Sequence, residues 1–72
     1  MPIGEAELDN WFTYHAPTPE QVTAYAALRA AARSFAREVV TWTPPSADQT
    51  TAIRKIREAV MTANAAIACG GK

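Results

Sequence analysis

Apolar residues recur at three- and four-residue intervals along two segments of the chain, and this spacing predicts two amphipathic α-helices. In the first segment they are Val22, Tyr25, Leu28, Ala32, Phe35, Val39 and Trp42. In the second segment they are Ile53, Ile56, Val60, Ala63 and Ile67. The regular alternation in the second segment is typical of the seam of a coiled-coil-like helix pair.

The first helix has clear start and stop signals. Thr18 is a good N-cap, Pro19 occupies the first helical position, and Gln21 completes a T-x-x-Q capping box. A pair of prolines directly after Thr43 cannot continue a helix. These signals predict a helix over about residues 18–43.

The second helix is bounded in the same way. Ser46 and Gln49 form an S-x-x-Q box, with Asp48 in the first turn, where a negative charge is favourable. Consecutive glycines beginning at Gly70 supply a C-terminal stop. The predicted helix spans about residues 46–69, and the short turn before it indicates an antiparallel αα-hairpin.

Residues 1–17 form an arm that precedes the hairpin. The stretch from Glu5 to Trp11 has room for a helical turn or two, and the residues leading to Pro17 are expected to be extended. The predicted fold is therefore all-α, an antiparallel two-helix hairpin with a short N-terminal arm. We expect a single domain over residues 1–72.

Composition adds an expectation of self-association. The hydrophobic fraction is 49%, but much of it is alanine, and a core this thin contributes about 3–5 kcal/mol at most. Alanines also lie away from the predicted seam, at Ala24, Ala27, Ala31, Ala52, Ala59 and Ala66. They are either exposed helix formers or an interface to another chain. The thin core favours the interface and an oligomer.

The charge and the residue content argue against several classes of protein. A formal net charge of +0 gives no general attraction to nucleic-acid polymers or anionic membranes, and no apolar run approaches a bilayer span of about 20 residues. A lone cysteine, Cys69, suits a reducing cytoplasm. One histidine without neighbouring ligands makes no metal site. No catalytic constellation or glycine-rich phosphate loop is visible, so we expect neither an enzyme nor a bound cofactor.

Two groups of side chains could carry binding chemistry. Arg29, Arg33 and Arg37 lie four residues apart, which opposes helix formation slightly, and they form either a solvated basic edge or a site for an anion such as phosphate. Trp11 and Tyr14 belong to the aromatic arm, with His15 following. These rings either pack the arm onto the hairpin or stack on a base.

A third candidate is Asn64, a polar residue close to the apolar seam and beside Arg57 and Met61. A polar amide there costs stability unless it finds partners. It either fixes the register of the helices or binds the polar edge of a ligand.

Together these residues resemble a phage family, the hairpin domain shared by anti-CBASS and anti-Thoeris sponge proteins. The resemblance covers about residues 12–68. It rests on Phe12-x-Tyr14-His15-x-Pro17, Gln21, Tyr25, Leu28-Arg29 and Glu58-Ala59-Val60-Met61-x-x-Asn64-Ala65-Ala66-Ile67-Ala68. Ala16 departs from the pattern, where a second proline is expected, and this puts the placement of His15 in doubt.

The resemblance implies a hexameric hairpin protein that binds signalling nucleotides without cleaving them, in the cytoplasm of the infected bacterial host, so that the antiviral effector stays inactive. Anti-CBASS members hold cyclic dinucleotides such as 3′,3′-cyclic GMP-AMP between protomers, and some also hold cyclic trinucleotides. Anti-Thoeris relatives, which bind cyclic ADP-ribose isomers, usually carry additional sequence outside the hairpin. The anti-CBASS type is therefore expected here, with a cyclic ADP-ribose sponge or a ligand-free interaction hairpin as alternatives.

The resemblance also assigns roles to residues. It implies that Tyr14 stacks on a nucleobase, that Arg29 grips phosphate, and that Asn64 lies near the same pocket. The full set of expected ligand-binding residues is Tyr14, His15, Arg29, Met61, Asn64, Trp11, Arg33 and Arg57.

Overall fold

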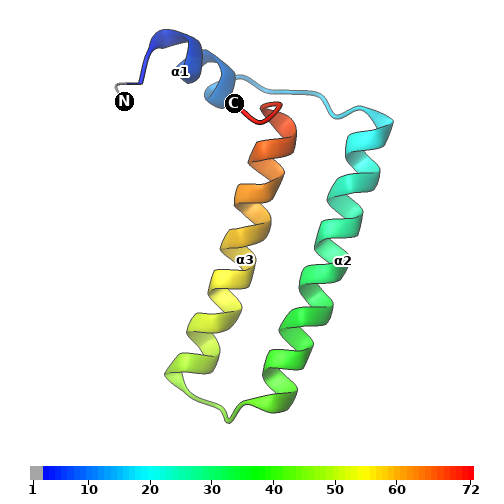
Figure 1. The fold of residues 1–72 in the computed structure, drawn as a ribbon, viewed down its shortest axis with the longest axis vertical. Helices are drawn as coiled ribbons and strands as arrows, with labels where there is room; N and C mark the ends of the chain where they lie inside the picture. The colour runs from blue at the N-terminus through cyan, green and yellow to red at the C-terminus, as the bar shows by residue number, and fades with distance from the viewer. Residues whose placement is uncertain (1–2) are drawn as a thin grey trace.

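A computed structural model describes residues 3–72, and within them it contains three helices and no strand. They are α1 (Glu5–Phe12), α2 (Pro19–Trp42) and α3 (Ala47–Ala68). Figure 1 shows α2 and α3 side by side and antiparallel, with α1 beside the C-terminus at the end of α3 and the arm running from α1 across the open end of the pair to α2. The all-α class is confirmed, and α1 is a third helix beside the two of the hairpin.

The start of α2 is fixed by the predicted capping box. The Thr18 hydroxyl accepts from the backbone N–H of Gln21 at 3.2 Å, and the backbone N–H of Thr18 donates to the Gln21 side-chain oxygen at 3.0 Å. Both groups would otherwise lack a partner at a helix N-terminus. This box therefore sets the direction in which the arm enters the hairpin.

The box predicted at the start of α3 is only half formed. The Ser46 hydroxyl accepts from the backbone N–H of Gln49 at 3.1 Å, as expected. The Gln49 side chain, however, turns away from Ser46 and donates to the carbonyl oxygens of Thr43 at 3.2 Å and Val40 at 3.5 Å. Carbonyls in the last turn of a helix lack intrahelical partners, and the short turn brings them within reach. Gln49 thus ties the two helices together at the turn.

The end of α3 is closed by the glycine pair. Gly70 and Gly71 have φ angles of 66° and 77°, in the region that side chains disfavour. The backbone N–H of Gly71 donates to the Ala66 carbonyl at 2.8 Å, and that of Gly70 donates to the Ile67 carbonyl at 3.3 Å. This is a Schellman motif, and it turns the chain back toward α1.

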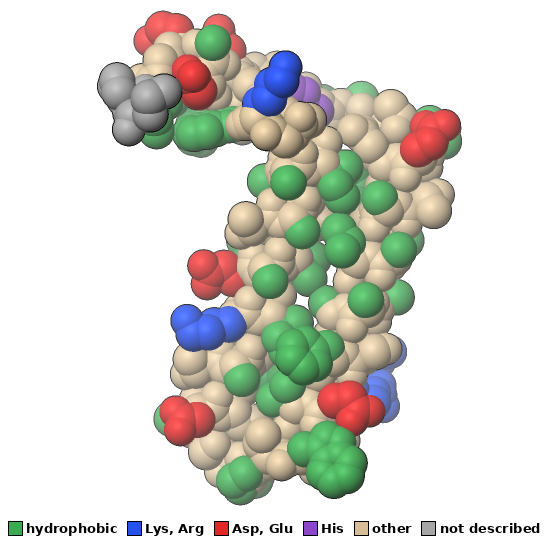
Figure 2. Space-filling model, viewed as in Figure 1, with side chains coloured by type: hydrophobic (Ala, Val, Ile, Leu, Met, Phe, Trp, Pro, Cys, Tyr) green, Lys and Arg blue, Asp and Glu red, His purple; other side chains and the backbone are tan. Residues whose placement is uncertain are grey.

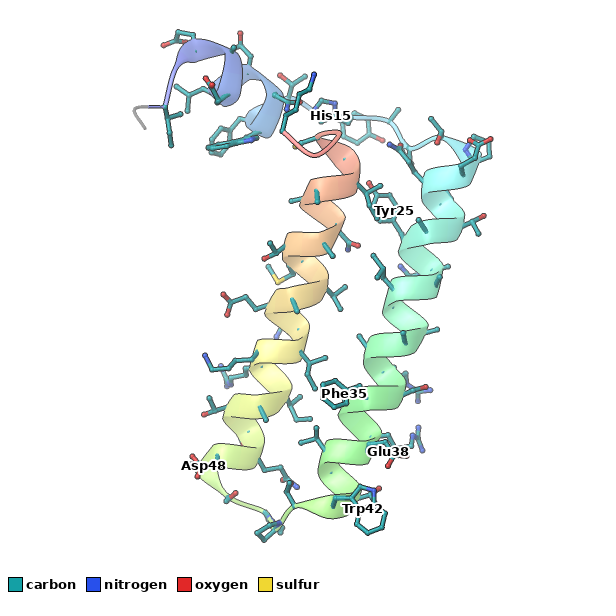
Figure 3. The ribbon with its side chains drawn as sticks, in the orientation of Figure 1. His15, Tyr25, Phe35, Glu38, Trp42 and Asp48 are labelled. Carbon is teal, nitrogen blue, oxygen red and sulfur yellow. The ribbon has the colours of Figure 1, made fainter. Side chains whose placement is uncertain are left out.

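The two helices pack along a seam but enclose no fully buried core. Among residues 3–72 no side chain is fully buried, because two helices cover only one stripe of each other. Of the seven apolar positions expected to form one face of α2, Val22, Phe35 and Trp42 remain 52%, 59% and 78% exposed. Figure 3 shows Tyr25 and Phe35 on the side of α2 that faces α3, while Trp42 lies at the turn. The packed stripe is therefore narrower than the sequence pattern.

Candidate functional site

The arm and α1 are attached to the end of α3 by side-chain hydrogen bonds. The Asn10 amide donates to the carbonyl oxygen of Cys69 at 3.2 Å, and the Cys69 thiol donates weakly to the Asn10 carbonyl at 3.7 Å. The Trp11 indole N–H donates to the Lys72 carbonyl at 3.0 Å. Cys69 and Lys72, on either side of the glycine pair, thus supply the carbonyl oxygens that attach α1 to the end of α3.

His15 continues this attachment into the arm. Its Nε2 lies 2.6 Å from the carbonyl oxygen of Asn10, a hydrogen bond in which the ring nitrogen is the donor because a carbonyl only accepts. The side chain is partly buried, and Figure 3 shows it at the junction of the arm with the end of α3. One ring nitrogen of His15 is thereby occupied within the protein.

The aromatic residues of the arm differ in how far they face solvent. Tyr14 is 83% exposed and Phe12 82% exposed, whereas Trp11 is 44% exposed and anchored through its N–H. An outward ring has both faces available for stacking on a base. Tyr14 and Phe12 are therefore the two aromatic side chains of the arm with a largely free ring.

Most of the remaining candidates lie along one face of the hairpin. With 3.6 residues per turn, Arg29 and Arg33 fall on the edge of α2 opposite Ala31. Arg57 and Met61 fall on the corresponding edge of α3. The three arginines are exposed, and Met61 is 62% exposed. This face presents cationic groups on both helices, with an apolar thioether one helical turn from Arg57.

Asn64 lies on the same edge of α3 but closer to the seam. It is partly buried, and its side-chain oxygen is shielded from solvent with no hydrogen-bond partner. Such an orphaned acceptor costs about 1–3 kcal/mol. The sequence left two roles open for Asn64, and one of them is to fix the register of the helices. That role would need a hydrogen-bond partner for this oxygen, and residues 3–72 supply none.

The opposite face of the hairpin carries an open apolar groove of about 740 Å³. It runs along the α2–α3 seam, and Lys55 is the one charged residue that lines it. The other lining residues are apolar: Leu28, Ala31, Ala32, Phe35, Val39, Ala52, Ile56, Ala59, Val60 and Ala63. Figure 2 shows hydrophobic side chains along the middle of this view, with charged side chains toward its edges. Three of the six off-seam alanines, Ala31, Ala52 and Ala59, line this groove.

Within residues 3–72, no group of histidine, cysteine and acidic side chains is placed to hold a metal ion. No helix in that part of the chain is long and apolar enough to cross a membrane. The features that the structure does offer are an exposed tyrosine, a cationic face with an unpartnered amide oxygen, and an apolar groove behind it.

The chain matches a known protein family. A family model described as Acb2/Tad1, hairpin domain, matches residues 4–68, which include all three helices. This confirms the resemblance inferred from the arm and the helix motifs. Neither the curated proteins nor the solved structures contain a significant match.

Proposed function

We propose a function for this chain from one premise, that it belongs to the Acb2/Tad1 hairpin-domain family. The family is one of binding proteins, and membership implies the role of a cyclic-nucleotide sponge. We infer that this chain binds cyclic dinucleotides such as 3′,3′-cyclic GMP-AMP and holds them without cleavage. Host CBASS effectors would then lack their activating signal in the cytoplasm of the infected cell.

The observation that carries this proposal is the outward position of Tyr14. A ring that is 83% exposed packs little against its own chain, so both of its faces are free to stack on a partner from outside. A purine base has the flat surface that such stacking requires. Phosphates of the same ligand would be met by Arg29, whose guanidinium can donate two parallel hydrogen bonds.

Tyr14 and Arg29 of one chain are too far apart to share a small ligand comfortably. Arg29 lies ten residues beyond Pro19, which is about 15 Å along the axis of α2 at 1.5 Å per residue, and Tyr14 precedes Pro19 on the arm. We infer that each ligand lies between protomers, with Tyr14 from one copy and Arg29 from another. Met61 and Asn64 would contribute from α3, and Arg33 and Arg57 would add positive charge around the phosphates. Trp11 would support the stacking surface.

Self-association is supported by the exposed apolar surface of the single chain. No side chain among residues 3–72 is fully buried, and the groove exposes apolar lining from Leu28 to Val39 of α2 and from Ala52 to Ala63 of α3. Contiguous apolar surface of this kind is a mark of an interaction site. We infer a homo-oligomer in which this groove is covered by other copies, with a hexamer as the expected assembly.

The function is tested by isothermal titration with 3′,3′-cyclic GMP-AMP, followed by analysis of the recovered nucleotide. Stoichiometric binding with the ligand released intact supports the sponge. Hydrolysed or linearised nucleotide, or consumption in excess of protein, would identify an enzyme instead. Binding only to cyclic ADP-ribose isomers would assign the chain to the anti-Thoeris type, and a cyclic trinucleotide in the same panel tests for a further ligand.

A panel without binding would favour the remaining alternative, a ligand-free interaction hairpin. In that case Tyr14→Ala and Arg29→Ala would change little beyond the stability of the protein. The two outcomes are therefore separated by the same set of titrations.

A further inference from the structure

Three hydrogen bonds converge on Asn10, one from the nearby arm and two that join it to the distant end of α3. The backbone carbonyl of Asn10 accepts from His15 Nε2 at 2.6 Å and from the Cys69 thiol at 3.7 Å. The Asn10 amide donates to the Cys69 carbonyl at 3.2 Å. The arm, α1 and the end of α3 are thus connected through one residue.

The arm itself has little else to hold it. Residues 14–17 form no backbone hydrogen bond within the part of the chain that the structure describes. Beyond them the next fixed point is the capping box of Thr18 and Gln21 at the start of α2. Among residues 13–17, His15 is therefore the one whose side chain is hydrogen-bonded to the part of the chain that the structure describes.

Tyr14 and His15 are neighbours that face different surroundings. His15 is partly buried and bonded to α1, whereas Tyr14 is 83% exposed. Fixing His15 restricts the backbone next to it, so the direction in which the Tyr14 ring projects is set by the contact of its neighbour. A segment ordered before binding does not have to lose that conformational entropy when the ligand arrives.

We propose that Asn10 and His15 form a clamp that holds the arm so that Tyr14 is presented to the ligand. His15 is in this view a positioning residue that acts through Tyr14, not a group that touches the nucleotide. The proposal rests on the proposed function, since it explains how the stacking residue of that site is held. It assigns a role to Asn10, which sequence patterns did not mark.

The rival explanation is that His15 contacts the nucleotide directly. Two variants distinguish the explanations, because an amide nitrogen of glutamine can replace Nε2 as donor to the Asn10 carbonyl, while alanine cannot. His15→Gln keeps the clamp and removes the imidazole. His15→Ala removes both. Asn10→Ala keeps the backbone carbonyl that His15 contacts but removes the amide that binds Cys69, so it loosens α1 from the end of α3 without altering His15. Thr13→Ala serves as an arm control whose side chain makes no hydrogen bond within residues 3–72.

The clamp is measured without ligand by ¹⁵N order parameters of the Tyr14 and His15 amides. In the wild-type chain we expect values near those of rigid backbone, about 0.85, and in His15→Ala values below about 0.6. Binding of 3′,3′-cyclic GMP-AMP, measured by isothermal titration, should weaken about tenfold in His15→Ala, as expected for the loss of one hydrogen bond. His15→Gln should restore both quantities, and Thr13→Ala should change neither.

Several results would overturn the clamp. Unchanged order parameters in His15→Ala would do so. Weaker binding in both His15→Ala and His15→Gln, with the arm still ordered, would also do so, because it would indicate that His15 contacts the ligand directly. If His15→Ala loses helicity by circular dichroism, His15→Leu, which keeps most of the bulk of the side chain but has no donor, replaces it in the comparison with His15→Gln. A wild-type chain that binds no nucleotide contradicts the proposed function, while the order parameters still establish or refute the clamp.

Discussion

Gln21 joins the start of α2 to the end of α3 by donating from its side-chain nitrogen to the carbonyl oxygen of Ile67 at 3.3 Å. The oxygen of the same amide accepts from the backbone N–H of Thr18 at 3.0 Å. One side chain thus caps a helix and crosses the open end of the hairpin, opposite the turn that Gln49 closes. Each end of the helix pair is held by a glutamine.

The two bonds of Gln21 can be separated by mutation. Gln21→Ala removes both and should destabilise the protein by about 1–2 kcal/mol, whereas Gln21→Glu keeps the acceptor for Thr18 and loses only the donor to Ile67, for about half that cost. Urea unfolding at one fixed protein concentration measures the difference. Equal losses in the two variants would show that the bond to Thr18 contributes nothing, and an unchanged stability in Gln21→Glu would show the same for the bond to Ile67.

Tyr14 should affect binding and leave stability alone. Its ring is 83% exposed, so Tyr14→Leu removes little packing, but the loss of base stacking should weaken nucleotide binding by about 1–3 kcal/mol. Tyr14→Phe should retain most of the affinity. The matched control is Phe12→Leu, on the same arm and 82% exposed, which should bind as the wild type does. Isothermal titration checks all three, and equal weakening by Phe12→Leu would count against a specific role for Tyr14.

The apolar groove should be required for assembly. Ala31 lines the groove, and Ala30 is exposed on the outer side of the same helix. Ala31→Glu and Ala30→Glu introduce the same side chain at nearly the same helical position, but only the first places a charge in an apolar interface, where burial is costly. Size-exclusion chromatography with light scattering should show a smaller species for Ala31→Glu alone. An unchanged mass in that variant would refute the groove as the contact between copies.

Asn64 should limit stability in the absence of ligand. Because its side-chain oxygen is buried and unpartnered, Asn64→Leu should raise the unfolding free energy of the ligand-free protein by about 1–3 kcal/mol. The same variant should bind nucleotide more weakly if that oxygen accepts from the ligand. Thermal unfolding and titration are measured together. A destabilised Asn64→Leu with an altered mass would instead indicate that a second copy satisfies the amide.

Local signals in the sequence predicted the elements of the hairpin well. Caps and stops act through neighbouring atoms, so Thr18, Ser46 and the glycines after α3 could be interpreted without knowledge of the fold. The side chain of Gln49 was assigned wrongly, because the carbonyls that attract it belong to the preceding helix and come close only when the turn has formed.

Hydrogen bonds between residues far apart in the sequence could not be predicted from the periodicity of apolar residues. The bonds from Asn10 to Cys69 and from Trp11 to Lys72 join residues that are 59 and 61 positions apart. Nothing in the local pattern marks an asparagine in a short helix as the partner of a C-terminal turn. The side of the hairpin that would carry the groove depends on how each helix is rotated about its axis, and packing decides that rotation. The ligand-binding roles of the candidate residues remain predictions.

The unsealed seam of the hairpin has a consequence for the lifetime of the protein in a cell. A lone copy, with every side chain of its described part at least partly open to water, would unfold often and expose its backbone to proteases. An assembled copy would open rarely and persist. Newly made chains would therefore be degraded quickly while they are scarce and accumulate once they meet one another, so that the protein level would rise more steeply than its rate of synthesis.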